Sequence, residues 1–268
     1  MRVIRSIALN VFKESVRDKV LYNLVFFAVM LIAVSYLLGE LTAGQDVKII
    51  KDLGLAAMSV FGLFIAVFIG IGLVSKEVER RSIYSLLAKP ISRQQFIVGK
   101  YLGLVLTLLV NVTVMTIAYY AVLGIMAWTA GSWMRPEWEA PALDPALLKA
   151  VAMIFLQLMI VTAVALLFST FSSPMLAAAL TFGLYIVGHF NTDLRQFQTV
   201  VRSRAVVYLA RAVYYVLPNL APFDLKAAVV HAQHVPGGLM VLNTVYALLY
   251  ITALMVATTL IFLRRDFK

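Results

Sequence analysis

The sequence contains no cysteine and few charged residues, and each shortage excludes a class of protein. Without cysteine the chain has no disulfide framework and no thiolate metal site, and its redox compartment cannot be read. Charged residues make up 13% of the 268 residues, whereas a soluble domain carries roughly a quarter. Hydrophobic residues make up 62% of the chain, and its mean hydropathy is +0.93. This excess of apolar side chains indicates an integral membrane protein.

Six apolar segments are long enough, or nearly so, to cross a bilayer as a helix, which takes about 20 residues. They are Val20–Leu38, Leu53–Val74, Tyr101–Trp128, Leu147–Phe168, Met175–Phe190 and Leu239–Leu263, of which the fifth is short and follows Pro174. Apart from Lys149, near the start of the fourth, these segments lack Asp, Glu, Lys and Arg. The sequence therefore predicts an all-α protein with six transmembrane helices. It predicts no ionisable group at mid-membrane, which disfavours a carrier driven by a proton or ion gradient.

The net charge of +10 fits a membrane protein better than a nucleic-acid-binding one. Lys and Arg gather on the cytoplasmic side of membrane proteins. With the N-terminus inside, 14 of the 23 Lys and Arg residues lie in the inner pieces of the chain. We therefore expect a multi-pass protein with both termini in the cytoplasm and no nucleic-acid partner.

Shorter helices are expected at both membrane surfaces. In residues 1–19 the apolar side chains recur at helical spacing, which predicts an amphipathic helix lying in the inner headgroup layer. The stripe consists of Ile4, Ile7, Ala8, Val11 and Phe12. Outside, the segment 191–238 predicts a helix over Val200–Leu217 and a second over Leu225–Gln233. We expect Asp224 to cap the second helix, Pro236-Gly237-Gly238 to close it, and both helices to lie on or dip into the outer leaflet.

A charged hairpin, Lys76–Lys100, separates the second and third apolar segments. Its first part predicts a helix with an apolar face formed by Ile83, Leu86 and Leu87, and Pro90 ends that helix. Ser92-Arg93-Gln94-Gln95 fits a capping box that starts a second helix. A loop that only sets topology needs charge but neither a cap nor an apolar face, so we interpret the hairpin as a rigid knob in the cytoplasm.

The stretch KEVERRSIYSLLAKPISRQQFIVGKYLG resembles the segment between the second and third spans of ABC-2 type transporter permeases. The matches are the acidic residues Glu77 and Glu79, the turn Pro90-Ile91-Ser92-Arg93, and Lys100. The amphipathic N-terminal helix, the six spans and the long outer segment before the last span are similar to that family's layout. The resemblance implies a membrane subunit that exports a substrate.

The resemblance further implies that the hairpin contains a coupling helix, which docks on a cytoplasmic ABC ATPase subunit present in two copies. The docking residues would be Glu79, Arg80, Arg81, Ile83, Tyr84, Leu86 and Leu87, and the coupling turn Pro90, Ser92 and Arg93. ATP and Mg²⁺ would bind in the partner, because the Gly99-Lys100 pair here lacks the rest of a phosphate-binding loop. A second permease subunit, identical or similar, would complete a dimer in the bacterial or archaeal cytoplasmic (inner) membrane, among membrane lipids. No catalytic residue, metal site or cofactor is expected in this chain.

Polar side chains within the apolar segments allow two interpretations. Asn111, Gln157 and Asn243 tie helices together by hydrogen bonds, or they line a translocation route. Small residues likewise recur every four positions at Gly62, Ala66 and Gly70, and at Gly99 and Gly103. They predict close helix packing, either within one subunit or between two.

Two alternatives to an export permease stay open. The long segment 191–238 would also suit an ATPase-driven mechanotransducer or assembly scaffold that acts on a periplasmic partner. A secondary carrier is the other alternative, and transport driven by an ion gradient alone would favour it. The sequence does not identify the substrate.

Overall fold

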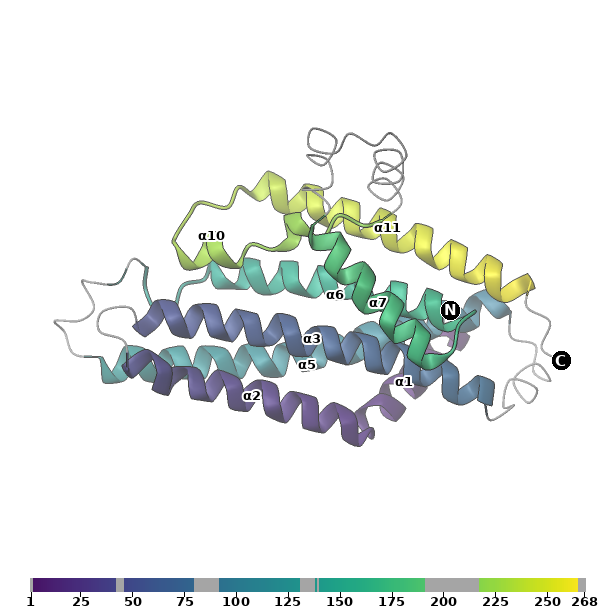
Figure 1. Cartoon of the computed structure of the whole chain (residues 1–268), viewed down its shortest axis with the longest axis horizontal. Coiled ribbons are helices and arrows are strands. Elements are labelled where there is room, and N and C mark those ends of the chain that lie inside the picture. The colour runs from purple at the N-terminus through teal and green to yellow at the C-terminus, as the bar shows by residue number, and fades with distance from the viewer. Residues whose placement is uncertain are drawn as a thin grey trace, which may run out of the picture.

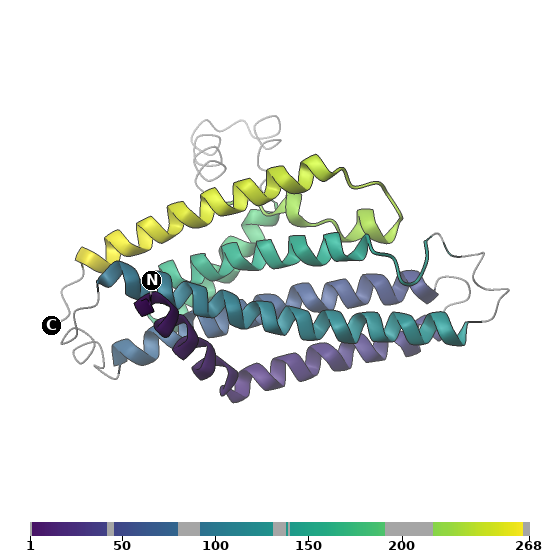
Figure 2. The ribbon, with the colours of Figure 1, turned by 180° about the vertical axis from the view of Figure 1, so that it is seen from behind.

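In a computed structural model of the chain, residues 2–41, 46–79, 92–130, 138, 140–190 and 217–264 are described, and this part is all-helical. Long helices lie side by side as an elongated bundle (Figure 1 and Figure 2). The helices are α1 (Arg2–Val16), α2 (Lys19–Glu40), α3 (Asp46–Glu79), α5 (Arg93–Thr129), α6 (Leu147–Ser169), α7 (Pro174–His189), α10 (Lys226–Val230) and α11 (Gly237–Arg264), with a 3₁₀ turn at Ala221–Phe223.

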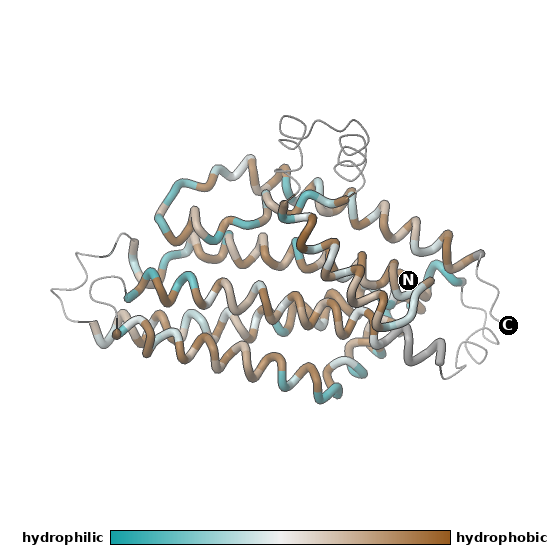
Figure 3. Tube along the Cα trace, in the orientation of Figure 1, coloured by the Kyte–Doolittle hydropathy of each residue, from teal (hydrophilic) through white to brown (hydrophobic). Residues whose placement is uncertain are grey.

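Five of these helices, namely α2, α3, α5, α6 and α11, are long and apolar enough to cross a membrane. The α7 helix is apolar but has only 16 residues. At 1.5 Å per residue it reaches about 24 Å, less than the ~30 Å hydrocarbon core. Hydrophilic segments concentrate toward the two ends of the bundle (Figure 3). The chain is therefore a multi-pass membrane protein.

Local sequence signals explain where several helices begin. Asp18 caps α2, because its carboxylate accepts a hydrogen bond from the Val20 N–H (3.0 Å). Ser92 caps α5 by accepting from the Gln95 N–H (3.3 Å), as the capping-box pattern predicts. Pro174 occupies the first turn of α7, where its missing N–H leaves no bond unmade.

The core is centred on α6, which packs against α3, α5, α7 and α11. Every residue from Ile160 to Leu166 is buried, so this helix has no lipid-facing side over two turns. By contrast, α2 and α11 each expose a row of large apolar side chains, as helices at the edge of a membrane bundle do. The end of the bundle that carries the α2–α3 connection and α10 is called the outer end below, following the expected orientation, and the opposite end the inner end (Figure 1).

The outer segment differs from the expectation in two ways. First, α10 covers only Lys226–Val230, and it packs against α3 and α6 with Val229 and Val230 buried, so it belongs to the bundle and not to its surface. It ends early because Ala232 adopts a left-handed conformation (φ 52°) that closes a Schellman motif. Second, Gly237 and Gly238 begin α11 and do not close the preceding helix. The predicted helix Val200–Leu217 lies almost wholly outside the described residues.

Candidate functional site

Most of the expected docking surface lies outside the described residues. This applies to Arg80, Arg81, Ile83, Tyr84, Leu86, Leu87 and Pro90. The backbone on either side is described: α3 continues without a break from the second span to Glu79, and α5 begins at Arg93. The two helices have 34 and 37 residues, about 51 and 56 Å at 1.5 Å per residue, so both are longer than the hydrocarbon core. The charged hairpin is therefore carried by two long helices.

Arg93, in the first turn of α5, fastens that helix to the last one. One guanidinium nitrogen donates to the carbonyl oxygens of Phe262 and Leu263, at 3.1 Å each. These carbonyls belong to the end of α11, where backbone acceptors lack partners inside the helix and a cation is favoured. The rings of Phe96 and Phe262 stack beside them, with centroids 5.9 Å apart. The start of α5 thus holds the end of α11 by polar and apolar contacts together.

The amphipathic helix α1 packs on the same end of α5. A Cβ at Gly99 would lie 2.8 Å from the Cβ of Ile7, and one at Gly103 would lie 2.6 Å from the Ala8 carbonyl oxygen. Only glycine allows so close an approach. We call this meeting point of α1, α5 and α11 the inner hub. Gly62 and Gly70 likewise face α6, so the small residues serve packing within one subunit here.

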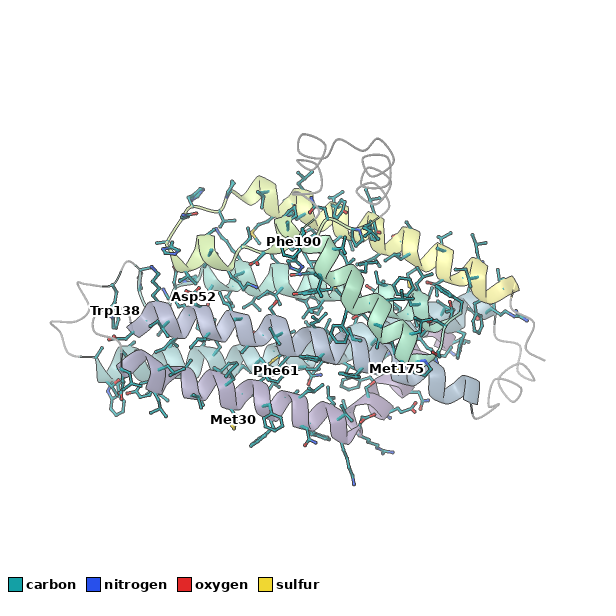
Figure 4. The ribbon with its side chains drawn as sticks, viewed as in Figure 1. Met30, Asp52, Phe61, Trp138, Met175 and Phe190 are labelled. Carbon is teal, nitrogen blue, oxygen red and sulfur yellow. The ribbon has the colours of Figure 1, made fainter. Side chains whose placement is uncertain are left out.

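The α7 helix ends at the middle of the bundle. Its last turn contacts Ser59, which lies 13 residues from each end of the span Asp46–Gly72, and Gln157, which lies 10 residues after Leu147. Both contacts are therefore at mid-span. Figure 4 agrees, because Phe190 lies part-way along the bundle between Asp52 and Met175. The fifth apolar segment thus supplies a helix that ends beside the middle of α3 and α6.

Four polar side chains from three helices meet at this point. The Gln157 amide nitrogen and His189 Nε2 are 2.8 Å apart, and His189 Nδ1 lies 2.9 Å from the Tyr185 carbonyl oxygen. The Tyr185 hydroxyl lies 3.4 Å from the Ser59 hydroxyl. Ser59 and Gln157 are buried, and His189 is partly exposed. We call these four residues the mid-span cluster.

After α7, the chain from Leu217 to Val235 packs against the bundle, largely without regular helix. Leu220 and Phe223 are completely buried there. Irregular backbone is tolerated at membrane depth only where protein covers it and supplies hydrogen-bond partners. The partners are supplied as follows: Leu220 N–H donates to the Gly188 carbonyl (2.9 Å), Asn219 N–H to the Tyr246 hydroxyl (2.9 Å), and the Asn243 amide to the Pro222 carbonyl (2.8 Å).

The three candidate route residues therefore occupy separate places. Gln157 belongs to the mid-span cluster, Asn243 holds the irregular segment, and the Asn111 amide donates to the Thr107 carbonyl of its own helix (2.7 Å). All three are at most 6% exposed. An open groove of about 430 Å³ between α5 and α11 is formed by other residues, among them Gln94, Tyr101, Thr252 and Leu263. In this conformation Gln157 and Asn243 join separate elements of the bundle, whereas Asn111 bonds within α5.

Comparison with protein-family models identifies the family to which the chain belongs. The model described as ABC-2 family transporter protein matches residues 5–267, nearly the whole sequence. The chain belongs to the ABC-2 transporter family. Among curated proteins, none matches the sequence closely enough to count as a relative. The protein is thus a membrane permease subunit of an ABC transporter, in a family whose members generally work with an ATPase partner and lack an ATP site of their own.

Sequence reasoning about this permease missed the mid-span cluster. The fifth apolar segment was expected to cross the membrane, which placed His189 at a membrane surface. The structure instead brings His189 to the middle of α6, so an ionisable side chain does lie at mid-span. The available signal was the shortness of the fifth segment, whose last residues are His189 and Phe190.

Proposed function

We propose that this permease is the export subunit of an ABC-2 transporter and that a separate cytoplasmic ATPase drives it through the hairpin between α3 and α5. Two copies of the ATPase and a second permease subunit would complete the complex in the cytoplasmic membrane, with both termini of this chain inside. The family match over residues 5–267 carries the proposal. Direction of transport, partner and membrane follow from the resemblance of the hairpin sequence.

The inner hub supports a route for the motion. A switch needs an element that makes different contacts in two states, and a stiff element passes movement on where a flexible one absorbs it. The hairpin leads directly into α5, whose first turn is capped by Ser92 and bonded through Arg93 to the end of α11. The same stretch of α5 supports α1. Movement of the hairpin would therefore reach α5, α1 and α11 together.

The proposal predicts that docking and transmission can be separated by mutation. We expect Leu86→Asp and Arg81→Glu to prevent the ATPase from co-purifying with the permease, because an apolar contact and a charge pairing are lost. Arg93→Gln should leave the ATPase bound but lower the permease-stimulated ATPase activity several-fold, because α11 no longer follows α5. The measurements are co-purification from native membranes and ATPase activity in liposomes.

Gln94→Ala is the matched control, because Gln94 is exposed and directly follows Arg93. It should keep both binding and stimulation. Full binding and full activity in both hairpin variants would refute the docking surface, and full stimulation in Arg93→Gln would refute the transmission route. Stimulation only by a periplasmic protein, and never by a lipidic or small substrate, would favour the mechanotransducer over the exporter.

A further inference from the structure

An open groove runs between α5 and α11 from the inner end of the bundle. The two helices are joined at the hub through Arg93 and Phe262, and from there they diverge (Figure 1 and Figure 2). On α11 the groove reaches from Leu263 back to Ile251, which is about 18 Å at 1.5 Å per residue. That length is close to the depth of one leaflet, since half of the hydrocarbon core is about 15 Å.

The walls of the groove require no polar ligand. Beyond Gln94 at the inner end, three polar side chains line it, and each hydroxyl is already bonded to a backbone carbonyl. The Tyr101 hydroxyl donates to a carbonyl of α6 at 3.2 Å, and those of Thr252 and Thr259 donate to carbonyls of the preceding turn of α11 at 2.7 and 2.8 Å. The other side chains along the groove, such as Val256, are apolar. Water does not fill an apolar space of this kind, so its occupant must be hydrocarbon.

The volume of the groove, about 430 Å³, limits what can fill it. A helix is about 10 Å across, so 18 Å of helix occupies roughly 1,400 Å³, and a helix of a second copy would cover the groove without filling it. An acyl chain is a single row of methylene groups, and the walls of a groove contact such a chain on several sides. Unfilled space deprives the wall atoms of dispersion contacts. A chain that fills the groove is therefore held longer than one that lies on a smooth helix face.

The two ends of the groove differ in polarity. The inner end has the exposed Gln94 and the guanidinium of Arg93, which donates to the Leu263 carbonyl at 3.1 Å. The other end is formed by Ile251 and Tyr101, which are both buried. A phospholipid of the inner leaflet has the same order, with its phosphate at the membrane surface and its chains toward the midplane. The positive charge of Arg93 complements that phosphate.

We propose that the groove between α5 and α11 binds one acyl chain of a phospholipid from the inner leaflet. The carboxyl end of the chain lies near Leu260 and Leu263, its methyl end lies near Ile251, and the phosphate lies at the membrane surface beside Arg93. The chain fills the space that opens between the two helices beyond the hub, so the lipid becomes part of the packing of α5 against α11. The proposal does not depend on which ATPase drives the permease or on what the permease exports.

The test is photo-crosslinking of the full-length protein in phosphatidylcholine nanodiscs. Phosphatidylcholine probes carry a diazirine on one acyl chain, near its carboxyl end, at its middle or at its methyl end, and mass spectrometry maps the labelled residues. We expect the carboxyl-end probe to label Leu260 and Leu263. The middle probe should label Val256, and the methyl-end probe Ile251. The order of the labelled sites along α11 then reports the direction in which the chain lies.

Val256→Trp should block the groove, because Val256 lines it and an indole is much larger than the side chain it replaces. We expect labelling of Ile251 by the methyl-end probe to fall about fivefold, since the ring takes the volume of the chain. Val114→Trp is the matched control. Val114 is 43% exposed on α5 and lies outside the groove, so the same change there should leave the labelling as it is in the parent. Native mass spectrometry gives a second measure: one phospholipid should stay bound to the parent under detergent conditions that strip it from Val256→Trp.

Three outcomes would overturn the site. The first is labelling spread evenly over the exposed faces of α2 and α11 wherever the diazirine sits, which would mean that lipids only surround the protein. The second is an order of labelling opposite to the expected one. The third is efficient disulfide formation between copies of Val256→Cys, which the absence of native cysteine makes readable and which would place a second copy over the groove.

The result does not depend on a single variant or on the proposed function. Should Val256→Trp fail to insert, the order of labelling in the parent still decides the question. Loss of ATPase binding in the hairpin variants would leave the labelling of the groove unaffected. Failure of one proposal is therefore distinguishable from failure of the other.

Discussion

The inner hub and the irregular segment Leu217–Val235 solve the same problem in different surroundings. Both hold backbone groups that lack partners within a helix. At the hub, Arg93 satisfies two carbonyls at the end of α11, close to the membrane surface. In the irregular segment, Asn243 and Tyr246 satisfy backbone groups against the interior of the bundle. The difference is whether water can replace a lost partner.

This difference separates stability from function. Removing the hydrogen-bond partner of a carbonyl at the surface changes the free energy of unfolding little, because water takes the place of the partner. Removing the partner of a buried carbonyl costs about 1 to 3 kcal/mol. We therefore expect Arg93 to matter for the transmission of movement more than for folding, and Asn243 to matter for folding first. Within the hub, only substitutions at the close contact between α1 and α5, where no solvent enters, should destabilise the protein as much as substitutions in the irregular segment.

The largest effect is expected at that contact. Gly103→Leu places side-chain atoms where the Ala8 carbonyl and Val11 lie within 2.7 Å of the Cβ, and a backbone carbonyl cannot yield cheaply. Overpacking of this kind costs about 1 to 3 kcal/mol, and we expect the upper part of that range. The free energy of unfolding in bicelles measures the loss. Detachment of α1 is read from maleimide labelling of Val11→Cys, since the chain has no native cysteine.

Gly124→Leu is the control for this substitution. It lies on the same helix, but a Cβ there meets nothing within 4 Å. It should stabilise α5 by about 0.5 to 1 kcal/mol, the difference in helix propensity. Equal stability of the two variants, or no added labelling of Val11→Cys in Gly103→Leu, would show that α1 does not depend on this approach.

The second prediction concerns the irregular segment. Asn243→Leu keeps the branched shape of the side chain but removes the donor to the partly buried Pro222 carbonyl, and we expect a loss of about 1 to 2 kcal/mol. Thr252→Val on the same helix should change stability by less than about 0.5 kcal/mol, because its hydroxyl returns to the Leu248 carbonyl. The free energy of unfolding measures both. A loss in Asn243→Leu no larger than in Thr252→Val would remove the distinction between the two regions.

The hub could be read largely from the sequence, because its signals are local. Ser92 and Gln95 lie three residues apart, which predicts the start of a helix. Gly99 and Gly103 lie four residues apart, which predicts that another helix packs closely on this one. The five long helices were predicted for the same reason, since a bilayer demands one continuous apolar run for each span. What the sequence left open was the identity of the partner helix, and the structure supplies α1 for the glycines.

The irregular segment and the mid-span cluster could not be read in this way. Asn243 lies 21 residues from Pro222, and Gln157 lies 32 residues from His189. No periodic pattern links such pairs, because a side chain that satisfies irregular backbone is chosen by position in space. Pro236-Gly237-Gly238 misled for a related reason: the same residues that close one helix can begin the next. The docking residues of the hairpin stay a prediction.

The smallest effect is expected at Ala232, and it has the opposite sign. The left-handed backbone conformation of Ala232 costs an L-residue about 1 to 2 kcal/mol, and glycine adopts it without this strain. Glycine in turn lowers the stability by about 0.5 to 1 kcal/mol, because its unfolded chain is more flexible. The strain relieved exceeds the entropic cost of glycine, so Ala232→Gly should stabilise the protein by about 0.5 kcal/mol. Ala227→Gly, at an exposed helical position of α10, has no strain to relieve and should destabilise by up to about 1 kcal/mol. Opposite signs in the free energy of unfolding would show that the end of α10 is set by the Schellman motif. Destabilisation by both would mean that Ala232 is not held in this conformation, and the irregular segment would then depend on Asn243 and Tyr246 alone.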